Sequence, residues 1–228
     1  MDCLDVGSGG GDVAFDLAHL VSPGGSVLGL DIDEIKLQLA RREARARHLS
    51  NVQFRAVDIA ENDVGTEFDF VHARFVLTHL REPAKALAKM HKATRPGGIV
   101  AVADIDFRGY FCHPHFPPFE RYVELYTTAV ERRGADPNIG PRLPSLLEGA
   151  GIRGVQMNVV QPAGTHGEVK LITPITMENI ADAVLAERLA SRKEIERLVS
   201  ELYAFAQDRS TVVSFPRVVE AWGYRPRG

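Results

Sequence analysis

The chain has 228 residues, 45% hydrophobic and 25% charged, which is the composition of a folded globular domain with a buried core. Its formal net charge of −3 gives no electrostatic reason to expect a nucleic acid or an anionic membrane as partner. No stretch is apolar for long enough to cross a bilayer, and the N-terminus lacks the basic start of a secretory signal. Cys3 and Cys112 have no metal or redox spacing. We therefore expect a cytoplasmic protein.

The first two-thirds of the chain alternates short apolar runs with longer amphipathic ones, which is typical of a parallel sheet flanked by helices. Strands are expected at residues 3–6, 26–30, 51–57, 68–73 and 99–104. Helices are expected at residues 12–20, 33–47 and 83–94, and they suit the crossovers that parallel strands require.

The alternation of strand-like and helix-like segments ends near residue 106. Residues 107–118 form a loop rich in aromatic, histidine and proline residues. Helices are expected at 119–133 and 141–149 and twice within 177–207, and strands at 154–161 and 211–222. Pro216 predicts an edge position or a bulge for the last strand. The chain is interpreted as one domain, 1–228, with a cofactor-binding half, 1–106, and a substrate-side half, 107–228, that carries the helical insertion 177–207.

A glycine-rich turn follows the first expected strand and reads Gly7-Ser8-Gly9-Gly10-Gly11-Asp12. Glycine lets a ligand approach the backbone because no Cβ intervenes, although the same residues could simply form a tight turn. The dinucleotide fingerprint G-x-G-x-x-G would need glycine at position 12, and a carboxylate there would repel pyrophosphate at a helix N-terminus. Asp12 therefore counts against NAD or FAD but not against a zwitterionic ligand that carries a sulfonium.

Acidic residues end the second and third expected strands, at the sheet edge where ligands of open parallel sheets bind. Asp31 can accept hydrogen bonds from both hydroxyls of a ribose, and we assign the cap of the next helix to Asp33. Asp58 can accept from an adenine amino group while Ile59 packs on the ring. Either acid alone could be a helix cap or a solvated turn residue, but the two in series favour an adenosine site.

Five segments in this order resemble the class I S-adenosylmethionine-dependent methyltransferase family, in particular its small-molecule branch related to ubiquinone, menaquinone and natural-product enzymes. They are Leu4-Asp-Val-Gly-Ser-Gly-Gly-Gly11, Gly29-Leu-Asp31, Val57-Asp58, Phe68-Asp-Phe-Val71 with Leu77-Thr-His-Leu80, and Arg95-Pro-Gly-Gly98. The resemblance covers residues 2 to about 106. It implies an α/β, Rossmann-like, doubly wound fold with a seven-stranded sheet, mostly parallel, whose last strand is antiparallel.

The resemblance also implies S-adenosyl-L-methionine as the cofactor. The residues expected to bind it are Asp5, Gly7, Ser8, Gly9, Gly11, Asp31, Ile32, Asp58, Ile59, Ala73 and Arg74. Small Ala73 leaves room for the methionine end, and Arg74 could serve its carboxylate or the substrate, with a surface salt bridge as an equal alternative. Relatives usually carry helices before the first strand, and we expect these lid helices to be absent.

Methyl transfer from a sulfonium needs nucleophile, methyl and sulfur in line, and a base helps when the acceptor is a hydroxyl. Our catalytic candidates are His79, Asp106 and His113, with Asp104 on the same strand as Asp106. His79 could instead cap its own helix, Asp106 could form a turn, and the aromatic loop could be packed as core. His113 and His115 lack the carboxylate partners of a metal site, so no metal is expected.

The sequence therefore predicts methyl transfer to a small, aromatic or polyketide-like metabolite, with oxygen as the acceptor atom. An alternative is a member of the same fold that binds the cofactor without methylating, which the missing N-terminal cover favours. A nicotinamide oxidoreductase is disfavoured by Asp12 and by the lack of a Tyr-x-x-x-Lys pair. A homodimer stays open, because the apolar stripe Ile195, Leu198, Leu202 and Phe205 suits either a core or a dimer interface.

Overall fold

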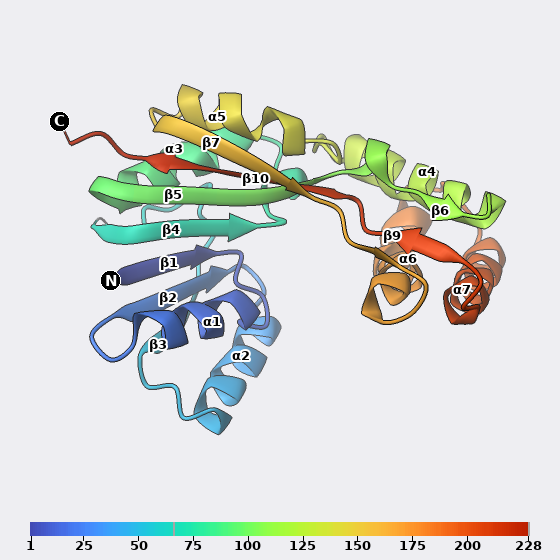
Figure 1. The fold of residues 1–228 in the computed structure, drawn as a ribbon, viewed down its shortest axis with the longest axis horizontal. Coiled ribbons are helices and arrows are strands. Elements are labelled where there is room, and N and C mark those ends of the chain that lie inside the picture. The colour runs from blue at the N-terminus through green and yellow to red at the C-terminus, as the bar shows by residue number, and fades with distance from the viewer. Residues whose placement is uncertain (66, 228) are drawn as a thin grey trace.

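A seven-stranded sheet forms the body of the larger lobe, in the strand order β3-β2-β1-β4-β5-β10-β7 (Figure 1). The computed structural model that shows it describes residues 1–65 and 67–227. The strands are β1 (Asp2–Val6), β2 (Ser26–Asp31), β3 (Val52–Ala56), β4 (Phe68–Arg74), β5 (Thr94–Asp106), β7 (Arg153–Val160) and β10 (Arg217–Tyr224). Only β10 runs antiparallel to its neighbours, β5 and β7. The expected fold class is confirmed.

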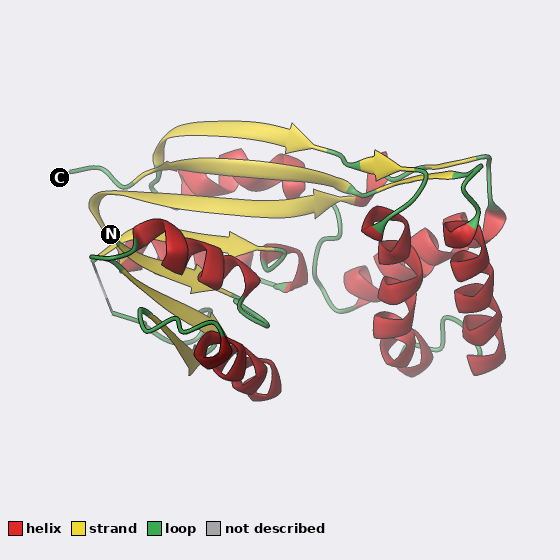
Figure 2. Cartoon of the chain, turned by 60° about the horizontal axis from the view of Figure 1, so that its bottom comes forward, coloured by secondary structure: helices red, strands yellow, loops and turns green. Residues whose placement is uncertain are grey.

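Helices cover parts of both faces of this sheet (Figures 1 and 2). Helices α1 (Asp12–Val21) and α2 (Glu34–Ala46) pack on one face, and α3 (Pro83–Ala93) and the short α5 (Leu143–Gly149) on the other. Each buries a stripe at helical spacing, as α3 does with Leu87, Met90 and Ala93. Asp33 caps α2 as expected, because its carboxylate accepts the backbone N–H groups of residues 35 and 36. Among the helices within residues 1–65 and 67–227, none has the length and apolarity to cross a bilayer.

Three long helices form the smaller lobe, together with a three-stranded sheet (Figure 2). The helices are α4 (Pro117–Arg132), α6 (Glu168–Ala186) and α7 (Arg192–Gln207), and the strands are β6 (Cys112–His113), β8 (Ala163–Gly164) and β9 (Val212–Ser214). Ile195, Leu198 and Leu202 are buried in the core of this lobe, and the Phe205 ring stacks on Phe116 with centroids 4.3 Å apart. The stripe of α7 is therefore core.

The helical insertion is longer than the sequence indicated. Helix α6 begins at Glu168, directly after Gly167, and contains Pro174 at its seventh position. A proline inside a helix removes one backbone hydrogen bond, so the pattern before residue 177 did not look helical. Short elements complete the chain, namely the 3-10 turns η1 (Leu77–His79), η2 (Phe107–Gly109) and η3 (Gly140–Arg142).

The expected edge position of the last strand is wrong. Strand β10 lies between β5 and β7, and Pro216 occupies the two-residue break between β9 and β10. The proline needs no ladder hydrogen bond there, so it is compatible with an inner strand.

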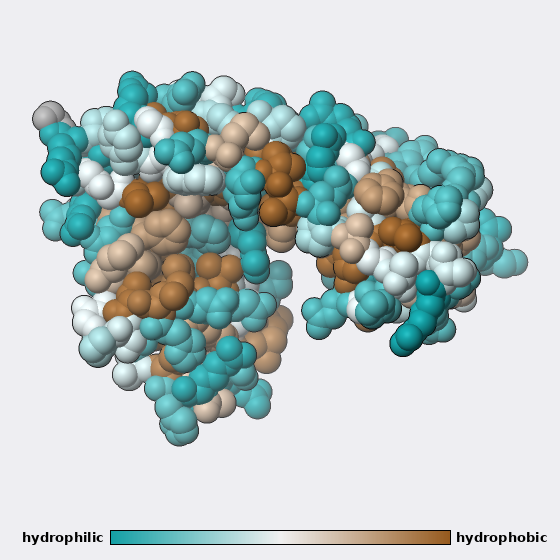
Figure 3. Space-filling view, in the orientation of Figure 1, coloured by the Kyte–Doolittle hydropathy of each residue, from teal (hydrophilic) through white to brown (hydrophobic). Residues whose placement is uncertain are grey.

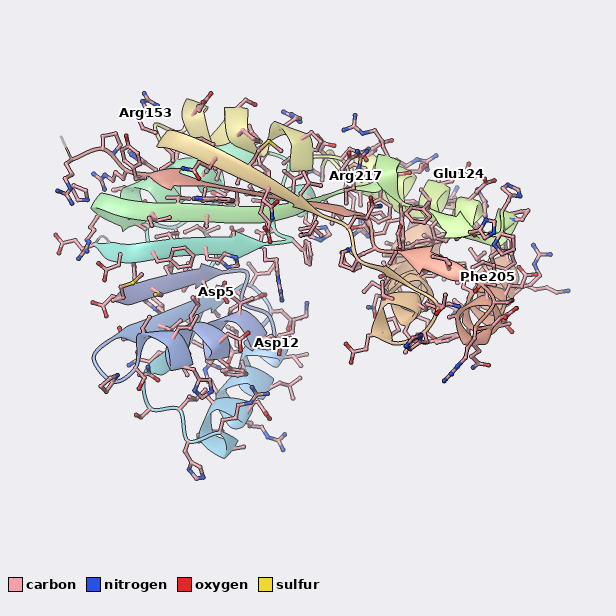
Figure 4. The ribbon with its side chains drawn as sticks, in the orientation of Figure 1. Asp5, Asp12, Glu124, Arg153, Phe205 and Arg217 are labelled. Carbon is pink, nitrogen blue, oxygen red and sulfur yellow. The ribbon has the colours of Figure 1, made fainter. Side chains whose placement is uncertain are left out.

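Four chain crossings join the two lobes, after β5, between α4 and α5, after β7 and before β10 (Figure 1). Arg217, labelled at this junction in Figure 4, places its Nη2 3.0 Å from Oδ2 of the buried Asp106. The side-chain amide of Gln161 donates to the carbonyl of Phe215 at 3.1 Å. These polar contacts link the crossings after β5, after β7 and before β10.

Candidate functional site

A cavity of about 440 Å³ lies where the strands of the larger lobe end. Strands β1, β2 and β4 point their carboxyl ends at the notch between the two lobes, which the space-filling view shows below the junction (Figures 1 and 3). The predicted cofactor residues that line the cavity are Gly7, Gly9, Asp31, Ile32, Asp58 and Ile59. The structure therefore brings together residues from three separate strand ends.

The glycine turn needs glycine for two different reasons. Gly7, Gly9 and Gly11 have φ values of +70°, +51° and +94°, a conformation that other residues rarely adopt. A Cβ at Gly7 would overlap Val76, and a Cβ at Gly11 would lie 2.6 Å from the Phe15 ring. Gly9 faces open space in the cavity, so its missing side chain leaves the backbone accessible to a ligand.

Asp31 holds the turn and faces the cavity. One carboxylate oxygen accepts the N–H of Gly9 at 2.8 Å, and the other accepts the N–H of Asp33 at 2.9 Å. A carboxylate oxygen has two acceptor sites, so each oxygen can accept a second hydrogen bond from a ligand hydroxyl. Across the cavity, Asp58 accepts the N–H of Ala60 at 2.8 Å, and the buried Ile59 supplies an apolar surface beside it.

Asp5 and Ser8 lie beneath the turn and do not line the cavity. Oδ1 of the buried Asp5 is 3.0 Å from Nδ1 of His72. Within the described part of the chain, Asp5 Oδ2 and Ser8 Oγ have no hydrogen-bond partner. Buried polar atoms without partners are rare, so this pair marks a polar spot under the glycine turn. Figure 4 shows Asp5 on β1, beside the start of α1.

A second cavity, of about 180 Å³, adjoins the first. Phe75 and His79 line both cavities, so they form a shared wall. The other residues of the second cavity come from both lobes and are mostly aromatic or aliphatic: Ile105, Phe107, Tyr110, Tyr122, Tyr126, Ile172, Thr176, Phe215 and Pro216. None of the described lining residues is Lys, Arg, Asp or Glu. This composition suits a neutral, flat ligand.

His79 is the titratable side chain at the shared wall. Desolvation lowers its pKa below 6.5, and the positive charges of Arg133 and Lys36 act in the same direction. The imidazole is therefore neutral at pH 7 and can accept a proton. The alternative of a helix cap is not observed, because among residues 1–65 and 67–227 the His79 side chain makes no hydrogen bond.

Asp104 anchors the turn that carries His79. One oxygen of its buried carboxylate accepts the N–H of Thr78 at 3.0 Å, and the other accepts the N–H of Ile105 at 3.0 Å. Desolvation raises the pKa of Asp104 to about 7, against an ordinary value of 3.8, and the Asp136 carboxylate adds to the rise. Asp104 does not line either cavity, so its contact with turn η1 is structural.

Replacing Asp104 with asparagine should change how stability depends on pH. The folded protein holds this proton up to about pH 7 and the unfolded chain loses it near pH 4, so stability falls as pH rises through that window. The loss is at most about 4 kcal/mol. Asparagine keeps an acceptor for Thr78, loses the one for Ile105 and cannot ionise, so the melting temperature of Asp104→Asn should fall less between pH 4 and 8 than that of the wild type.

The measurement is the melting temperature of both proteins between pH 4 and 8. Asp16→Asn, a change at an exposed acid on α1, is the matched control and should leave the wild-type pH dependence intact. Equal slopes for Asp104→Asn and the wild type would contradict the prediction.

The other predicted catalytic residues lie away from the two cavities. Asp106 is held in ion pairs, with Arg108 Nε at 2.7 Å from one carboxylate oxygen and Arg217 Nη2 at 3.0 Å from the other, so both oxygens already have partners. His113 is exposed on the short strand β6 of the helical lobe. His115 lies 2.9 Å from Glu120 on the surface. Because the pairing of Asp106 with Arg217 depends on how the lobes pack, no local pattern could have separated Asp106 from His79.

Ala73 and Arg74 are the last two residues of β4 but do not line the cavity. The Arg74 guanidinium lies 5.6 Å from the centre of the Phe75 ring. Gly11 likewise contributes to the start of α1 rather than to the cavity surface.

Several lining residues were not predicted. Lys36 follows the capping Asp33 by one helical turn, and Phe75 and Val76 come directly after Arg74, so their place in the sequence could have indicated them. Ile172 and Thr176 come from α6, and no sequence signal connects them with the strand ends. Their position follows from the packing of the helical lobe.

The fold and the cavity at its strand ends define a Rossmann-like protein of the methyltransferase type. The family profile described as a methyltransferase domain matches residues 1–129. The chain belongs to this methyltransferase domain family.

Relatives and solved structures agree with this. An uncharacterized 37.1 kDa protein in transposon TN4556 of Streptomyces fradiae is 30% identical over 203 residues, 88% of this chain and 53% of its own length. The ubiquinone biosynthesis O-methyltransferase of Acinetobacter baylyi is 30% identical over 105 residues, 45% of this chain and 43% of its own. This chain thus spans about half the length of these curated relatives. Phosphoethanolamine N-methyltransferase 2 of Haemonchus contortus shares the fold, with a TM-score of 0.62 and 18% identity, covering 99% of this chain and 49% of that one.

Proposed function

We propose that this protein binds S-adenosyl-L-methionine and transfers its methyl group to a small aromatic or polyketide-like molecule, with oxygen as the accepting atom. The observation that carries the proposal is Asp31, whose carboxylate holds the Gly9 amide and keeps acceptor sites free toward the cavity. S-adenosyl-L-methionine, when bound, supplies an electrophilic methyl group on a sulfonium. Gly9 leaves its backbone open to the methionine part, Asp31 accepts from the ribose, and Asp58 with Ile59 holds the adenine.

The residues around this cavity fit the cofactor. Asp5 and Ser8 remain predicted cofactor positions, and their oxygens without partners in the described chain mark a polar spot beneath the glycine turn, outside the cavity lining. Gly11, Ala73 and Arg74 remain predicted cofactor positions that shape the surroundings of the cavity. Asp12 lies in the first turn of α1, where it opposes a pyrophosphate.

The second cavity is the proposed acceptor site. Its uncharged, aromatic lining suits a planar neutral molecule, and the relative from Acinetobacter is named for O-methylation in ubiquinone biosynthesis. His79 lies between the two cavities and is the proposed base, because its lowered pKa keeps it neutral at pH 7. The helical lobe closes this site from one side, so residues 1–106 would bind the cofactor and residues 107–228 the acceptor.

Calorimetric titration with S-adenosylmethionine, S-adenosylhomocysteine and NAD tests the cofactor assignment. We expect binding of the two sulfur compounds and none of NAD. Binding of NAD without binding of S-adenosylhomocysteine would overturn the proposal. Cofactor binding with no methylation across a panel of phenols, amines and carboxylic acids would favour the alternative, a member of the fold that binds the cofactor without methylating.

Two adjacent glycines, Gly9 and Gly10, provide a matched test of whether the cofactor approaches the glycine turn. Gly9→Ala places a methyl group in the cavity at a φ of +51°, so we expect S-adenosylhomocysteine affinity to fall about tenfold, which is about 1.4 kcal/mol. Gly10→Ala meets no atom within 4 Å and lies outside the cavity lining, so it should bind like the wild type. Titration calorimetry compares the two, and equal affinities would show that the ligand does not approach Gly9.

A further inference from the structure

Phe75 has an unusual backbone for an aromatic residue. Its φ is +57°, in the left-handed region where a side chain clashes with its own backbone. Its N–H donates to the carbonyl of Ala103 at 2.9 Å, which fixes the backbone at the end of β4. Strain of this kind persists where the surrounding structure imposes it, and it is common at functional sites.

The turn at Phe75 sends two neighbouring side chains in different directions. The Phe75 ring packs against Phe215 of the acceptor cavity, with centroids 6.0 Å apart. Val76 lies against Gly7 of the glycine turn, so closely that a Cβ at Gly7 would overlap it. A regular continuation of β4 would not place one residue over the glycine turn and its neighbour at the aromatic cavity.

We infer that Phe75 is a specificity-determining wall that separates the cofactor cavity from the acceptor cavity and restricts the acceptor to a single aromatic ring. The inference rests on the proposed function and deepens it by naming the size class of the acceptor. Phe75 belongs to both cavities, whereas its partner Phe215 belongs to the acceptor cavity alone. The ring therefore limits how far a molecule in the smaller cavity can extend toward the cofactor.

A pair of variants that both lack the ring separates backbone strain from the wall. Glycine adopts the positive φ of position 75 without strain and alanine does not. The melting temperature of Phe75→Gly should therefore be about 2–4 °C higher than that of Phe75→Ala. This order is the reverse of the usual one, in which alanine is more stable than glycine. An alanine variant that melts at or above the glycine variant would contradict the strained geometry.

The wall itself is tested by binding of phenol and 2-naphthol, titrated with and without saturating S-adenosylhomocysteine. We expect the wild type to prefer phenol. Both Phe75 variants should shift the ratio of affinities toward 2-naphthol by about tenfold, because the ring no longer blocks the second fused ring. Both should shift it equally despite their different stabilities, which a merely structural role would not produce.

Phe215→Ala is the control for loss of an aromatic ring. It should leave S-adenosylhomocysteine affinity unchanged, whereas both Phe75 variants should lower that affinity about threefold or more. An unchanged 2-naphthol ratio in the Phe75 variants, or a wild type that binds neither compound, overturns the inference. Absence of S-adenosylhomocysteine binding in the wild type overturns the proposed function instead, and the titrations without it still test the wall.

Discussion

Asp31→Ala should weaken S-adenosylhomocysteine binding about 100-fold or more, with little loss of folding stability. The carboxylate would accept two ribose hydroxyls, and hydrogen bonds to a charged group contribute about 1.5–3 kcal/mol each. The substitution also frees the N–H of Gly9, which is held at 2.8 Å, and so loosens the turn that faces the methionine part. Titration calorimetry gives the affinity and thermal unfolding the stability.

Asp33→Asn is the matched control for this change. It removes one negative charge from the wall of the same cavity, and asparagine caps a helix about as well as aspartate. We expect its affinity to stay within about threefold of the wild type. If Asp31→Ala bound as tightly as the wild type, Asp31 would be a structural support of the turn and not a ribose ligand.

His79→Gln should lower kcat for a phenolic acceptor about 100-fold or more, the range expected when a general base is removed. S-adenosylhomocysteine affinity should change much less, because glutamine preserves a polar side chain of similar length. In the wild type, kcat requires neutral His79 and should be constant above its pKa and fall below it. Desolvation lowers that pKa below 6.5, so the fall belongs on the acidic side of pH 6.5.

The pKa of His79 can also be read from its imidazole signals by NMR, independently of turnover. His113→Gln makes the same substitution at the other histidine candidate, which is exposed on β6. This variant should have nearly the same kcat as the wild type. A kcat that is unaffected by His79→Gln would indicate an acceptor that needs no base, such as a carbon or a neutral amine. A similar loss for His113→Gln would place the reaction at the surface of the helical lobe.

The local sequence pattern was sufficient to predict which residues lie at the carboxyl ends of the strands. The order of apolar runs predicted the sheet, and the acids after β2 and β3 proved to border one cavity. The physical reason is that parallel strands deliver their carboxyl ends to the same edge, so a residue that directly follows a strand is placed by topology alone. The capping role of Asp33 was also predictable, because it depends on only three residues of chain.

The choice among base candidates was not predictable in this way. Asp106 looked as well placed as His79, yet it is paired with Arg217, which is more than 100 residues away in the chain. Its partner is set by the junction between the lobes. Ile172 and Thr176 reach the second cavity because α6 packs beside the sheet, and hydrophobic periodicity along the chain does not indicate a contact between segments so far apart.

The order of residues along the chain was enough to predict the class of fold and the residues that line the cavity at the strand ends, because glycine geometry, helix caps and strand-end acids act over a few residues. The surroundings of the second cavity, the proposed acceptor site, follow from the packing of the two lobes. This packing places Phe75 at a positive φ between two cavities, lowers the pKa of His79 through desolvation, and holds Asp106 in ion pairs. Those properties depend on which distant side chains surround a residue, and packing of the two lobes is what brings them together.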